Sequence, residues 1–323
     1  MRSIKSALAA ALLACGAVGA SAMSYTGVTF FGDSLSDTGN IFLATGGVLP
    51  VAPYYSGRFS DGPVWTDYLA AGLGFSATPS LAGGNNYAFG GARTGTGLTP
   101  PGLLAQTGGM WAPTVADPDR LYVLLGGGND MRDARDTYQT NSVADQNGRE
   151  AAAQAAAGNL KTSLQVLAAN GAKHVLIGNL PDLGRTPEAA ALGREAASTD
   201  AAARFNAQMP ALMSFGQGLG LDMRFVDLVA VATAVFDDAT LNGGAVYGIT
   251  NISTPCGSFT GSIGIACSVS AYSDALHPTT RVHALFGDAA LAAATAPIPE
   301  PQTYALLLLG LLALGWRVQR RAR

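Results

Sequence analysis

Charged side chains are scarce in this chain, at 13% of its 323 residues. Little charge and 41 glycines argue against a disordered chain and are typical of a well-packed, exported α/β protein. The few charges are also unevenly placed, because six of the 19 basic residues lie near the two ends. Residues 23–298 keep 13 basic and 21 acidic residues, a net charge of −8, which makes binding to nucleic acid or an anionic membrane improbable.

Histidine and cysteine are equally rare, with three of each. They show no metal-ligand spacing, so we expect no metal site. No lysine follows a Gly-rich turn in the Gly-Lys-Ser/Thr pattern, which excludes a P-loop. Cys15 lies in the N-terminal segment. The remaining pair, Cys256 and Cys267, is expected to form a disulfide, because the chain is predicted to be exported.

Long hydrophobic runs are missing except at the two ends of the chain. Arg2 and Lys5 precede an apolar run over 7–20, and the small residues Ala20-Ser21-Ala22 follow. This order predicts a secretory signal peptide over residues 1–22. The alternative is a lipoprotein signal with Leu12-Leu13-Ala14-Cys15 as the lipidation box, but the apolar run continues past Cys15 to a better cleavage site.

The C-terminus contains Pro299-Glu300-Pro301, then an apolar stretch over 304–316, then an arginine-rich tail. Thirteen apolar residues fall short of the roughly 17–25 that a membrane-spanning helix needs. The arrangement resembles the PEP-CTERM sorting signal of Gram-negative bacteria, which an exosortase recognises and usually cuts near Pro-Glu-Pro. The resemblance implies that residues 297–323 direct the protein to the cell envelope, the surface or the extracellular matrix. A plain C-terminal membrane anchor is the alternative interpretation.

Between the two ends, short apolar runs alternate with helical patterns. Buried strands are predicted over 28–31, 121–125, 173–177 and 223–226, with a strand-like start at 85–89. A helix is predicted from 65, with Trp65 and Leu69 on one face that packs into the core. Further helices are predicted over 145–169, which Asn170-Gly171 should stop, over 188–215, with a break near Pro210, and over 281–294. This alternation predicts one α/β domain over 23–296, a three-layer α/β/α sandwich around a mostly parallel sheet.

The sequence Gly32-Asp33-Ser34 breaks the first strand, and a helix is predicted to start over 35–42. A serine at a strand-to-helix turn presents its hydroxyl beside backbone N–H groups, which suits a nucleophile whose reaction forms an oxyanion. The alternative is an ordinary turn in which Asp33 and Ser34 cap a helix.

Two other stretches place polar or glycine residues after predicted strands. Asn129-Asp130 follows the strand over 121–125, and α/β folds bind ligands at the carboxyl ends of such strands. An Asx turn is the alternative for this pair. The adjacent glycines Gly90-Gly91 allow a positive φ and a close approach of the backbone to a ligand.

Asp274 and His277 are three residues apart, and Pro278 biases His277 away from a helical backbone. In a turn, the carboxylate can bind one ring nitrogen and leave the other free to accept a proton from a hydroxyl. The alternative is a capping aspartate beside a surface histidine. Of the other histidines, His174 is expected to be structural, and His283 is expected on the outer side of the last helix.

Four blocks together resemble the SGNH or GDSL hydrolases, in the family's order and near its usual spacing. The blocks are Gly-Asp-Ser-Leu-Ser-Asp-Thr-Gly-Asn from Gly32, Asn-Tyr-Ala-Phe-Gly-Gly-Ala from Asn86, Gly-Gly-Gly-Asn-Asp from Gly126, and Asp-Ala-Leu-His-Pro from Asp274. The longer first block, with Gly-Arg-Phe-Ser-Asp-Gly-Pro-Val-Trp from Gly57, is similar to the branch that contains secreted lipases, lecithinases and haemolysins. The resemblance implies the flavodoxin-like SGNH fold.

The resemblance also implies a role for each matching residue. Ser34 would attack an ester carbonyl, His277 would move its proton, and Asp274 would orient His277. The oxyanion hole would consist of the backbone N–H of Ser34, the backbone N–H of Gly91 and the side-chain amide of Asn129. The order of the block favours Gly91 over Gly90.

The expected function is that of an exported esterase or lipase that needs no cofactor and takes an ester substrate. One alternative is an O-acetyl esterase acting on extracellular polysaccharide, suggested by the C-terminal signal. Another is a non-catalytic surface protein, which would not need Ser34, Asp274 and His277 together. We expect the loops over 41–60, 92–115 and 240–272 to form the pocket walls.

Overall fold

The computed structural model describes residues 24–111, 115–257 and 264–297. Within these ranges, residues 25–294 form one compact unit. The predicted signal peptide over 1–22 and the apolar stretch over 304–316 lie outside the described residues.

Four parallel strands form the central sheet, in the order β1 (Val28–Gly32), β2 (Leu121–Leu125), β3 (His174–Gly178) and β4 (Asp222–Val226). The register aligns Phe30 with Val123, and Val123 with Leu176. Each of these strands was predicted to within a residue at either end. Their continuous apolar sequences reflect burial on both faces, since helices cover the sheet on both sides.

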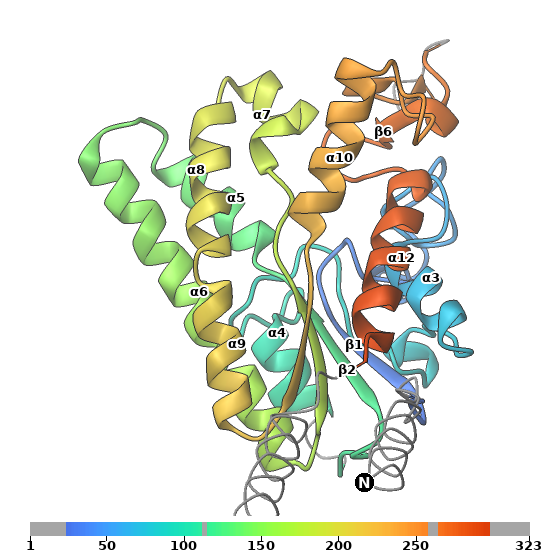
Figure 1. The fold of residues 1–323 in the computed structure, drawn as a ribbon, viewed down its shortest axis with the longest axis vertical. Coiled ribbons are helices and arrows are strands. Elements are labelled where there is room, and N and C mark those ends of the chain that lie inside the picture. The colour runs from blue at the N-terminus through green and yellow to red at the C-terminus, as the bar shows by residue number, and fades with distance from the viewer. Residues whose placement is uncertain (1–23, 112–114, 258–263, 298–323) are drawn as a thin grey trace, which may run out of the picture. The chain divides into compact units, whose positions relative to one another are not determined.

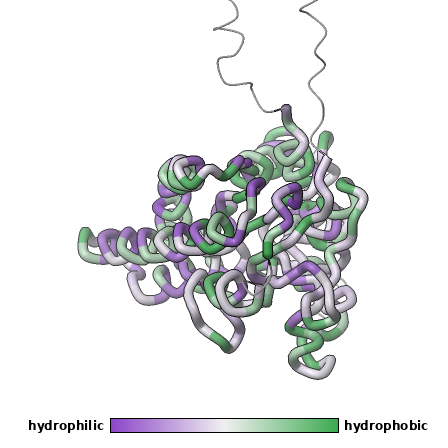
Figure 2. The backbone as a smooth tube through the Cα atoms, turned by 90° about the horizontal axis from the view of Figure 1, so that it is seen from below, coloured by the Kyte–Doolittle hydropathy of each residue, from purple (hydrophilic) through white to green (hydrophobic). Residues whose placement is uncertain are grey.

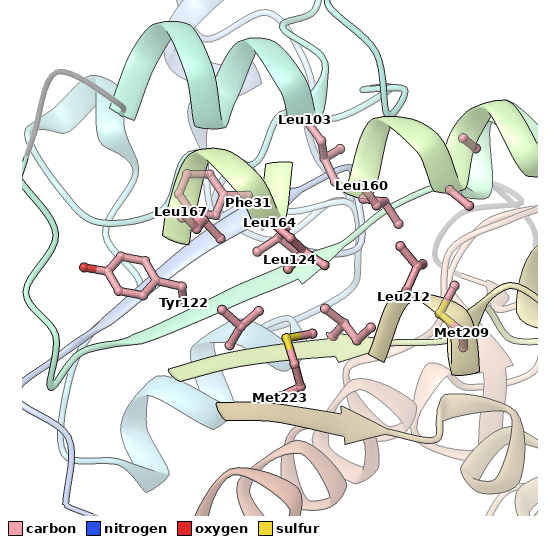
Figure 3. Packing of buried hydrophobic residues seen from close by; sticks show 14 of the residues in the cluster. Phe31, Leu103, Tyr122, Leu124, Leu160, Leu164, Leu167, Met209, Leu212 and Met223 are labelled. Atoms are coloured by element: carbon pink, nitrogen blue, oxygen red, sulfur yellow. The ribbon is translucent and has the colours of Figure 1, made fainter. Parts of the chain in front are cut away.

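One face of the sheet packs against α4 (Leu103–Ala105), α6 (Val143–Ala169), α8 (Glu195–Asn206) and α9 (Met209–Gly218). Phe31 and Leu124 point into this core and meet leucines of α6 (Figure 3). Helix α6 begins where the Ser142 side chain accepts a hydrogen bond from the Asp145 N–H. It stops at the predicted Asn170-Gly171, where Gly171 has a φ of +99°.

The opposite face packs against α3 (Trp65–Gly72) and α12 (Thr280–Thr295) (Figure 1). The ring of Phe30 lies 6.4 Å from that of Trp65 in an edge-to-face arrangement. Trp65 and Leu69 are both buried, as their helical spacing indicated. The predicted three-layer α/β fold with a parallel sheet is therefore confirmed.

Several local predictions were wrong. Residues 85–89 form no strand, and only Asn86 makes isolated bridges there, to Phe30 and Pro79. The helix expected over 35–42 is a turn followed by the short α2 (Asn40–Ala44). The helix begins later than predicted because the carboxylate of Asp37 accepts hydrogen bonds from the N–H groups of Gly39, Asn40 and Ile41.

Other boundaries also differ from the prediction. The helix over 188–215 is divided into α7 (Pro187–Leu192), α8 and α9. The break between α8 and α9 lies beside Pro210, as expected, but the break at Gly193, where φ is +63°, was not predicted. The loop over 240–272 contains β5 (Asn251–Pro255) and β6 (Ser270–Tyr272). No prediction covers α10 (Leu228–Leu241). The remaining elements are α5 (Gly128–Thr137), η2 (Ser80–Ala82), η3 (Gln106–Trp111), η4 (Leu183–Arg185) and η5 (Cys267–Val269).

Hydrophilic and hydrophobic residues alternate along the helices of this unit (Figure 2). In the described part of the chain, no helix combines the length and the apolar character that a membrane crossing requires.

The prediction for His283 was also wrong, because its side chain is fully buried where α12 meets α3. Its Nδ1 accepts a hydrogen bond of 3.2 Å from the Trp65 N–H, and its Nε2 has no partner among the described residues. Burial, with a smaller contribution from repulsion by His277, lowers the pKa of His283 to about 3. The folded protein therefore holds this ring neutral.

We expect His283 to make the protein less stable in acid. Below pH 6.5 His283 becomes protonated in the unfolded chain, whereas in the folded chain it stays neutral down to about pH 3. The free energy of unfolding therefore falls as the pH decreases over this range. His283→Asn keeps an acceptor for Trp65 but does not titrate. Between pH 7 and pH 5 the free energy of unfolding of this variant should decrease by about 2 kcal/mol less than that of the wild type.

Urea unfolding of both proteins at pH 7 and pH 5 measures this difference. The comparison with the wild type is essential, because burial raises the pKa of Asp33 to about 6, which has the opposite effect on stability over part of this range. An identical pH dependence in the two proteins would show that His283 does not resist protonation.

Candidate active site

Ser34 lies in the turn that follows β1, at the carboxyl end of the sheet. The carbonyl of Asp33 accepts hydrogen bonds of 3.0 Å from the N–H groups of both Ser36 and Asp37, which closes the turn tightly. The Ser34 side chain is only 7% exposed, but it lines a cavity. The local sequence thus holds the hydroxyl at the sheet edge where α/β folds bind ligands.

Asp37 joins this turn to residues 86–92, the block that contains Gly90 and Gly91 and is called the glycine block below. Its Oδ2 accepts a hydrogen bond of 2.8 Å from the Gly90 N–H. Two asparagines add further links, since Asn40 donates to the carbonyls of Asn86 and Ala88, and Asn86 donates to the carbonyl of Ser36. The two blocks, separated by some fifty residues in sequence, are therefore held against each other by buried hydrogen bonds.

The two adjacent positions require glycine for different structural reasons. Gly91 has a φ of +78°, which favours glycine, and it lines the same cavity as Ser34. The Gly90 N–H is already bound to Asp37, and a Cβ at Gly90 would overlap the ring of Phe59. Within the described ranges the Gly91 N–H has no hydrogen-bond acceptor, so of the two glycines it is Gly91 that can donate to a ligand.

Asn129 stands in the first turn of α5, directly after β2. Its amide is held at both ends, because Nδ2 donates to the Ala92 carbonyl at 3.0 Å and Oδ1 accepts from Arg132 Nη1 at 3.0 Å. Arg132 is itself paired with Glu188, with 2.9 Å between Nε and Oε2. These bonds aim the NH₂ group of Asn129 toward the glycine block, and Asn129 lines the cavity with Ser34 and Gly91.

His277 connects Ser34 with Asp274. Its Nε2 lies 2.8 Å from Ser34 Oγ, and its Nδ1 lies 2.6 Å from Asp274 Oδ2. Asp274 Oδ1 accepts hydrogen bonds from the N–H groups of Leu276 and His277, so the carboxylate organises its own turn. With Nδ1–H donating to Asp274, the other ring nitrogen can accept the serine proton.

The carboxylate beside the imidazole is held in its ionised form. Burial alone would raise the pKa of Asp274, but attraction to His277 and the hydrogen bonds from His277 and Tyr54 outweigh it and lower the pKa well below its usual range. Asp274 is therefore ionised at neutral pH. Burial raises the pKa of Asp33 to about 6, so this second carboxylate near His277 is also mostly ionised at pH 7.

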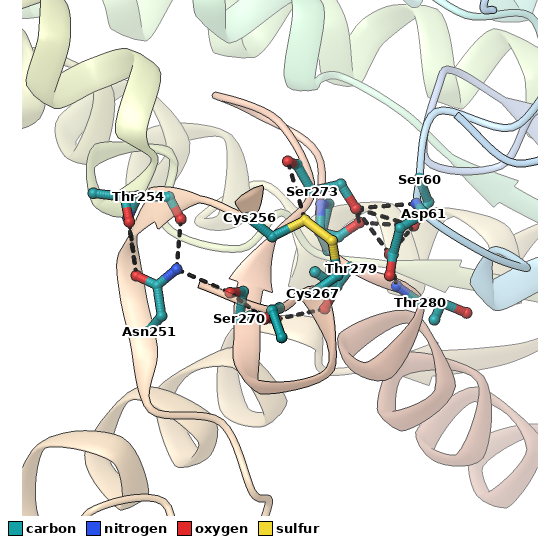
Figure 4. The surroundings of a disulfide bond; sticks show 12 residues. Ser60, Asp61, Asn251, Thr254, Cys256, Cys267, Ser270, Ser273, Thr279 and Thr280 are labelled. Atoms are coloured by element: carbon teal, nitrogen blue, oxygen red, sulfur yellow. Dashed lines mark hydrogen bonds between the residues drawn. A yellow bond between two sulfur atoms is a disulfide. The ribbon is translucent and has the colours of Figure 1, made fainter. Parts of the chain in front are cut away.

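The turn that carries Asp274 is anchored to two other loops (Figure 4). Ser273 donates a hydrogen bond of 3.0 Å to Asp61 Oδ1, which also accepts from the Thr280 N–H at 2.7 Å. Cys256 and Cys267 form a disulfide, and the Cys256 N–H donates to the Tyr272 carbonyl. The disulfide-bonded loop and the loop of Asp61 thus hold the segment on either side of Asp274 and His277.

Two aromatic residues of the site were not predicted from the sequence. The Tyr54 hydroxyl donates to Asp274 Oδ2 at 2.5 Å. The Phe59 ring lies 5.2 Å from the imidazole of His277 and 6.0 Å from the ring of Tyr54. Burial, then the hydrogen bond to Asp274, raises the pKa of Tyr54, so its hydroxyl remains a donor. The sequence offered only one weak signal, a pair of aromatics in a loop expected to border the pocket.

The pocket is lined only in part by the other loops that were expected to form its walls. None of the described residues of 92–115 lines either of the two cavities that meet at Ser34, and the described residues of 240–272 contribute only Ala271 and Tyr272. The walls come instead from α10, α12 and the segment 180–186.

Within the described ranges, His, Cys, Asp and Glu form no group of three or more that could hold a metal. His174, at the opposite end of β3, binds Asp222 at 3.0 Å.

Comparison with known proteins places this geometry in context. Residues 28–290 match the family model of the GDSL-like lipases and acylhydrolases, and residues 297–321 match the PEP-CTERM protein-sorting motif. The first match spans all four sequence blocks and every site residue described above.

Three curated proteins share part of the sequence. An uncharacterized protein in the trpE-trpG intergenic region of Pseudomonas putida is 34% identical over 210 residues, covering 56% of this chain and 32% of that protein. A phosphatidylcholine-sterol acyltransferase of Aeromonas hydrophila is 34% identical over 186 residues, covering 51% and 48%. Lipase 1 of Photorhabdus luminescens is 28% identical over 183 residues, covering 52% and 24%. The matches thus span less than half the length of each relative.

Solved structures are similar at low identity. A lipolytic protein of the G-D-S-L family from Veillonella parvula is 15% identical, with 83% of this chain and 98% of that chain covered and a TM-score of 0.45. A carbohydrate acetylesterase from Sinorhizobium meliloti is 18% identical, with 81% and 95% covered and a TM-score of 0.41.

Asn129→Ala should lower kcat on a carboxylic ester by about a hundredfold to a thousandfold, the usual effect of losing one oxyanion donor. Asn179→Ala is the matched control, because it removes an equally buried amide whose partners are Asp227 and Val229. Steady-state kinetics on both variants, with circular dichroism to verify folding, tests the role. A folded Asn129→Ala protein with wild-type turnover would remove Asn129 from the site.

Tyr54→Phe should lower kcat threefold to tenfold, because Asp274 loses a hydrogen bond. The carboxylate then attracts the imidazolium proton more strongly, so the acidic limb of the kcat/KM profile should move to higher pH. Tyr55→Phe, at the 46% exposed neighbouring residue, is the control and should leave the profile unchanged. A merely structural role for Tyr54 would reduce the yield of folded protein without moving the limb.

Proposed function

The chain belongs to the family of GDSL-like lipases and acylhydrolases, and from this premise we propose that it is an exported serine hydrolase of carboxylic esters. The observation that carries the proposal is the continuous hydrogen-bond chain from Ser34 Oγ through His277 to Asp274, with distances of 2.8 Å and 2.6 Å. A serine, a general base and a carboxylate in this order are the parts that acyl transfer requires.

The reaction would begin when Ser34 Oγ attacks the ester carbonyl carbon and His277 Nε2 takes the hydroxyl proton. The tetrahedral intermediate collapses as Nε2 gives this proton to the departing alcohol, which leaves an acyl-enzyme on Ser34. A water molecule then gives a proton to Nε2 and attacks the acyl carbon, and the acid is released as Ser34 regains its proton. Asp274 holds the tautomer and stabilises the imidazolium in each half of the cycle.

The oxyanion would be held by the N–H groups of Ser34 and Gly91 and by the amide of Asn129. Two features support this assignment. All three residues line one cavity together with His277. In the part of the chain that is described, no protein acceptor takes up the backbone N–H of Ser34 or Gly91. Donors held in place before the reaction stabilise the developing charge with little reorganisation.

The sorting motif supports a location for this chemistry. We place the mature enzyme at the cell envelope, at the surface or in the extracellular matrix of a Gram-negative bacterium, with residues 1–22 as its signal peptide. An exosortase would process the segment over 297–321. The partners are then an ester and a processing enzyme, and the acidic body gives no reason to expect nucleic acid.

A second candidate keeps the same machinery but acts on O-acetyl groups of an extracellular polysaccharide. The PEP-CTERM motif favours it, because such sorting systems accompany polysaccharide production in the bacteria that use them. Release of acetate from an acetylated glycan without hydrolysis of longer acyl esters would decide for this candidate. A non-catalytic surface role is less well supported, since a binding protein has no need of the Ser34–His277–Asp274 chain.

The purified protein should hydrolyse p-nitrophenyl esters, and Ser34→Ala should lose this activity by several orders of magnitude while keeping its circular dichroism spectrum. Initial rates across acyl chains of increasing length provide the measurement. Full activity in the folded Ser34→Ala variant would exclude the serine mechanism. A folded wild type inactive on every ester would favour the acetylated glycan or a binding role.

A further inference from the structure

Two cavities of different polarity meet at Ser34. The first has a volume of about 70 Å³ and is walled mainly by apolar side chains. Ala232, Val235 and Phe236 line it from α10, and Val282 and Phe286 line it from α12. Ser34, Asn129 and His277 stand at its edge, so the cavity begins where the ester carbonyl would bind.

The second cavity shares Ser34, Asn129, Arg132, Leu276 and His277 with the first but is more polar. Its other walls include Tyr54, Glu188 and Asp274, which bring hydroxyl and carboxylate groups to the surface beside Phe59 and Ala275. Gly91 opens onto this second cavity and not onto the first. An ester bound at Ser34 therefore meets an apolar space on one side and a polar space on the other.

We propose that the apolar cavity binds the acyl chain of the substrate and that the polar cavity binds its alcohol. The substrate class is then a short-chain acyl ester, with an acyl group longer than acetyl, of a polar alcohol. This proposal rests on the proposed function, because it assigns the two sides of the same reaction centre. The apolar walls favour chains longer than acetyl, since each methylene that leaves water improves binding and, if the gain reaches the transition state, raises kcat/KM by about fourfold.

Because Phe236 is held in place by its neighbours, the apolar wall limits the size of the acyl chain that fits in the cavity. Phe236 is held between Arg185, whose guanidinium carbon lies 4.9 Å from the ring centre, and Tyr272, whose ring lies 6.2 Å away. Ala232 precedes Val235 and Phe236 by three and four residues, so all three occupy one face of α10. Figure 1 shows α10 beside β6 and above α12, beyond the ends of the strands. A larger side chain at 232 would occupy the cavity directly.

The test compares Ala232→Leu with Ala230→Leu in the full chain. The substitution is identical and lies on the same helix, but Ala230 is exposed and lines neither cavity. The three added carbons should displace about two methylenes of the substrate. We expect kcat/KM on p-nitrophenyl butanoate, whose acyl chain matches the cavity volume, to fall by about tenfold in Ala232→Leu. Activity on p-nitrophenyl acetate should stay within about twofold, and Ala230→Leu should match the wild type on both.

A binding measurement separates this proposal from the proposed function. Isothermal titration of butanoate into the Ser34→Ala protein should show binding that Ala232→Leu abolishes and Ala230→Leu keeps. This binding pattern in a protein that hydrolyses no ester would support the assignment of the cavity and reject the hydrolase function. Equal losses on acetate and butanoate esters, an unchanged length profile in Ala232→Leu, or butanoate binding that does not depend on residue 232 would each overturn the acyl assignment.

Discussion

The buried carboxylate of Asp37 is the constraint on which the candidate site depends. It is completely inaccessible to solvent and accepts hydrogen bonds from four backbone N–H groups, those of residues 39, 40, 41 and 90. Burial raises the pKa of Asp37, and these bonds act in the opposite direction. Because a buried carboxylate is costly without such partners, neither the serine turn nor the glycine block can move away without a large penalty.

A second polar link joins the oxyanion side to the turn of the histidine. Glu188 pairs through its side chain with Arg132 and Arg135, and its backbone N–H donates to the Ala275 carbonyl at 2.7 Å. Arg132 in turn holds the amide of Asn129. One residue at the start of α7 thus contacts both the support of Asn129 and the turn between Asp274 and His277. The two halves of the site share a common scaffold, although they are about 145 residues apart in sequence.

Chemistry and selectivity have different structural sources in this protein. The groups proposed for bond breaking lie in short motifs at the ends of β1 and β2 and in the turn before α12. The walls that would select a substrate come from α10, α12 and the segment 180–186, which carry no motif. Helix α10 contributes walls of the cavity but none of the groups proposed for bond breaking.

The sequence by itself determined the four strands, the parallel three-layer fold and the short motifs, because each depends on neighbouring residues and on apolar periodicity. It also brought Asp274 and His277 into one turn through Pro278. Only the tertiary structure decided which groups from distant segments meet. Tyr54 reaches Asp274 across 220 residues, and Phe59 reaches His277 while leaving room only for a glycine at 90. His283 is buried because α12 packs against α3, not because of its own neighbours. Such contacts depend on the packing of whole elements, which local patterns do not encode.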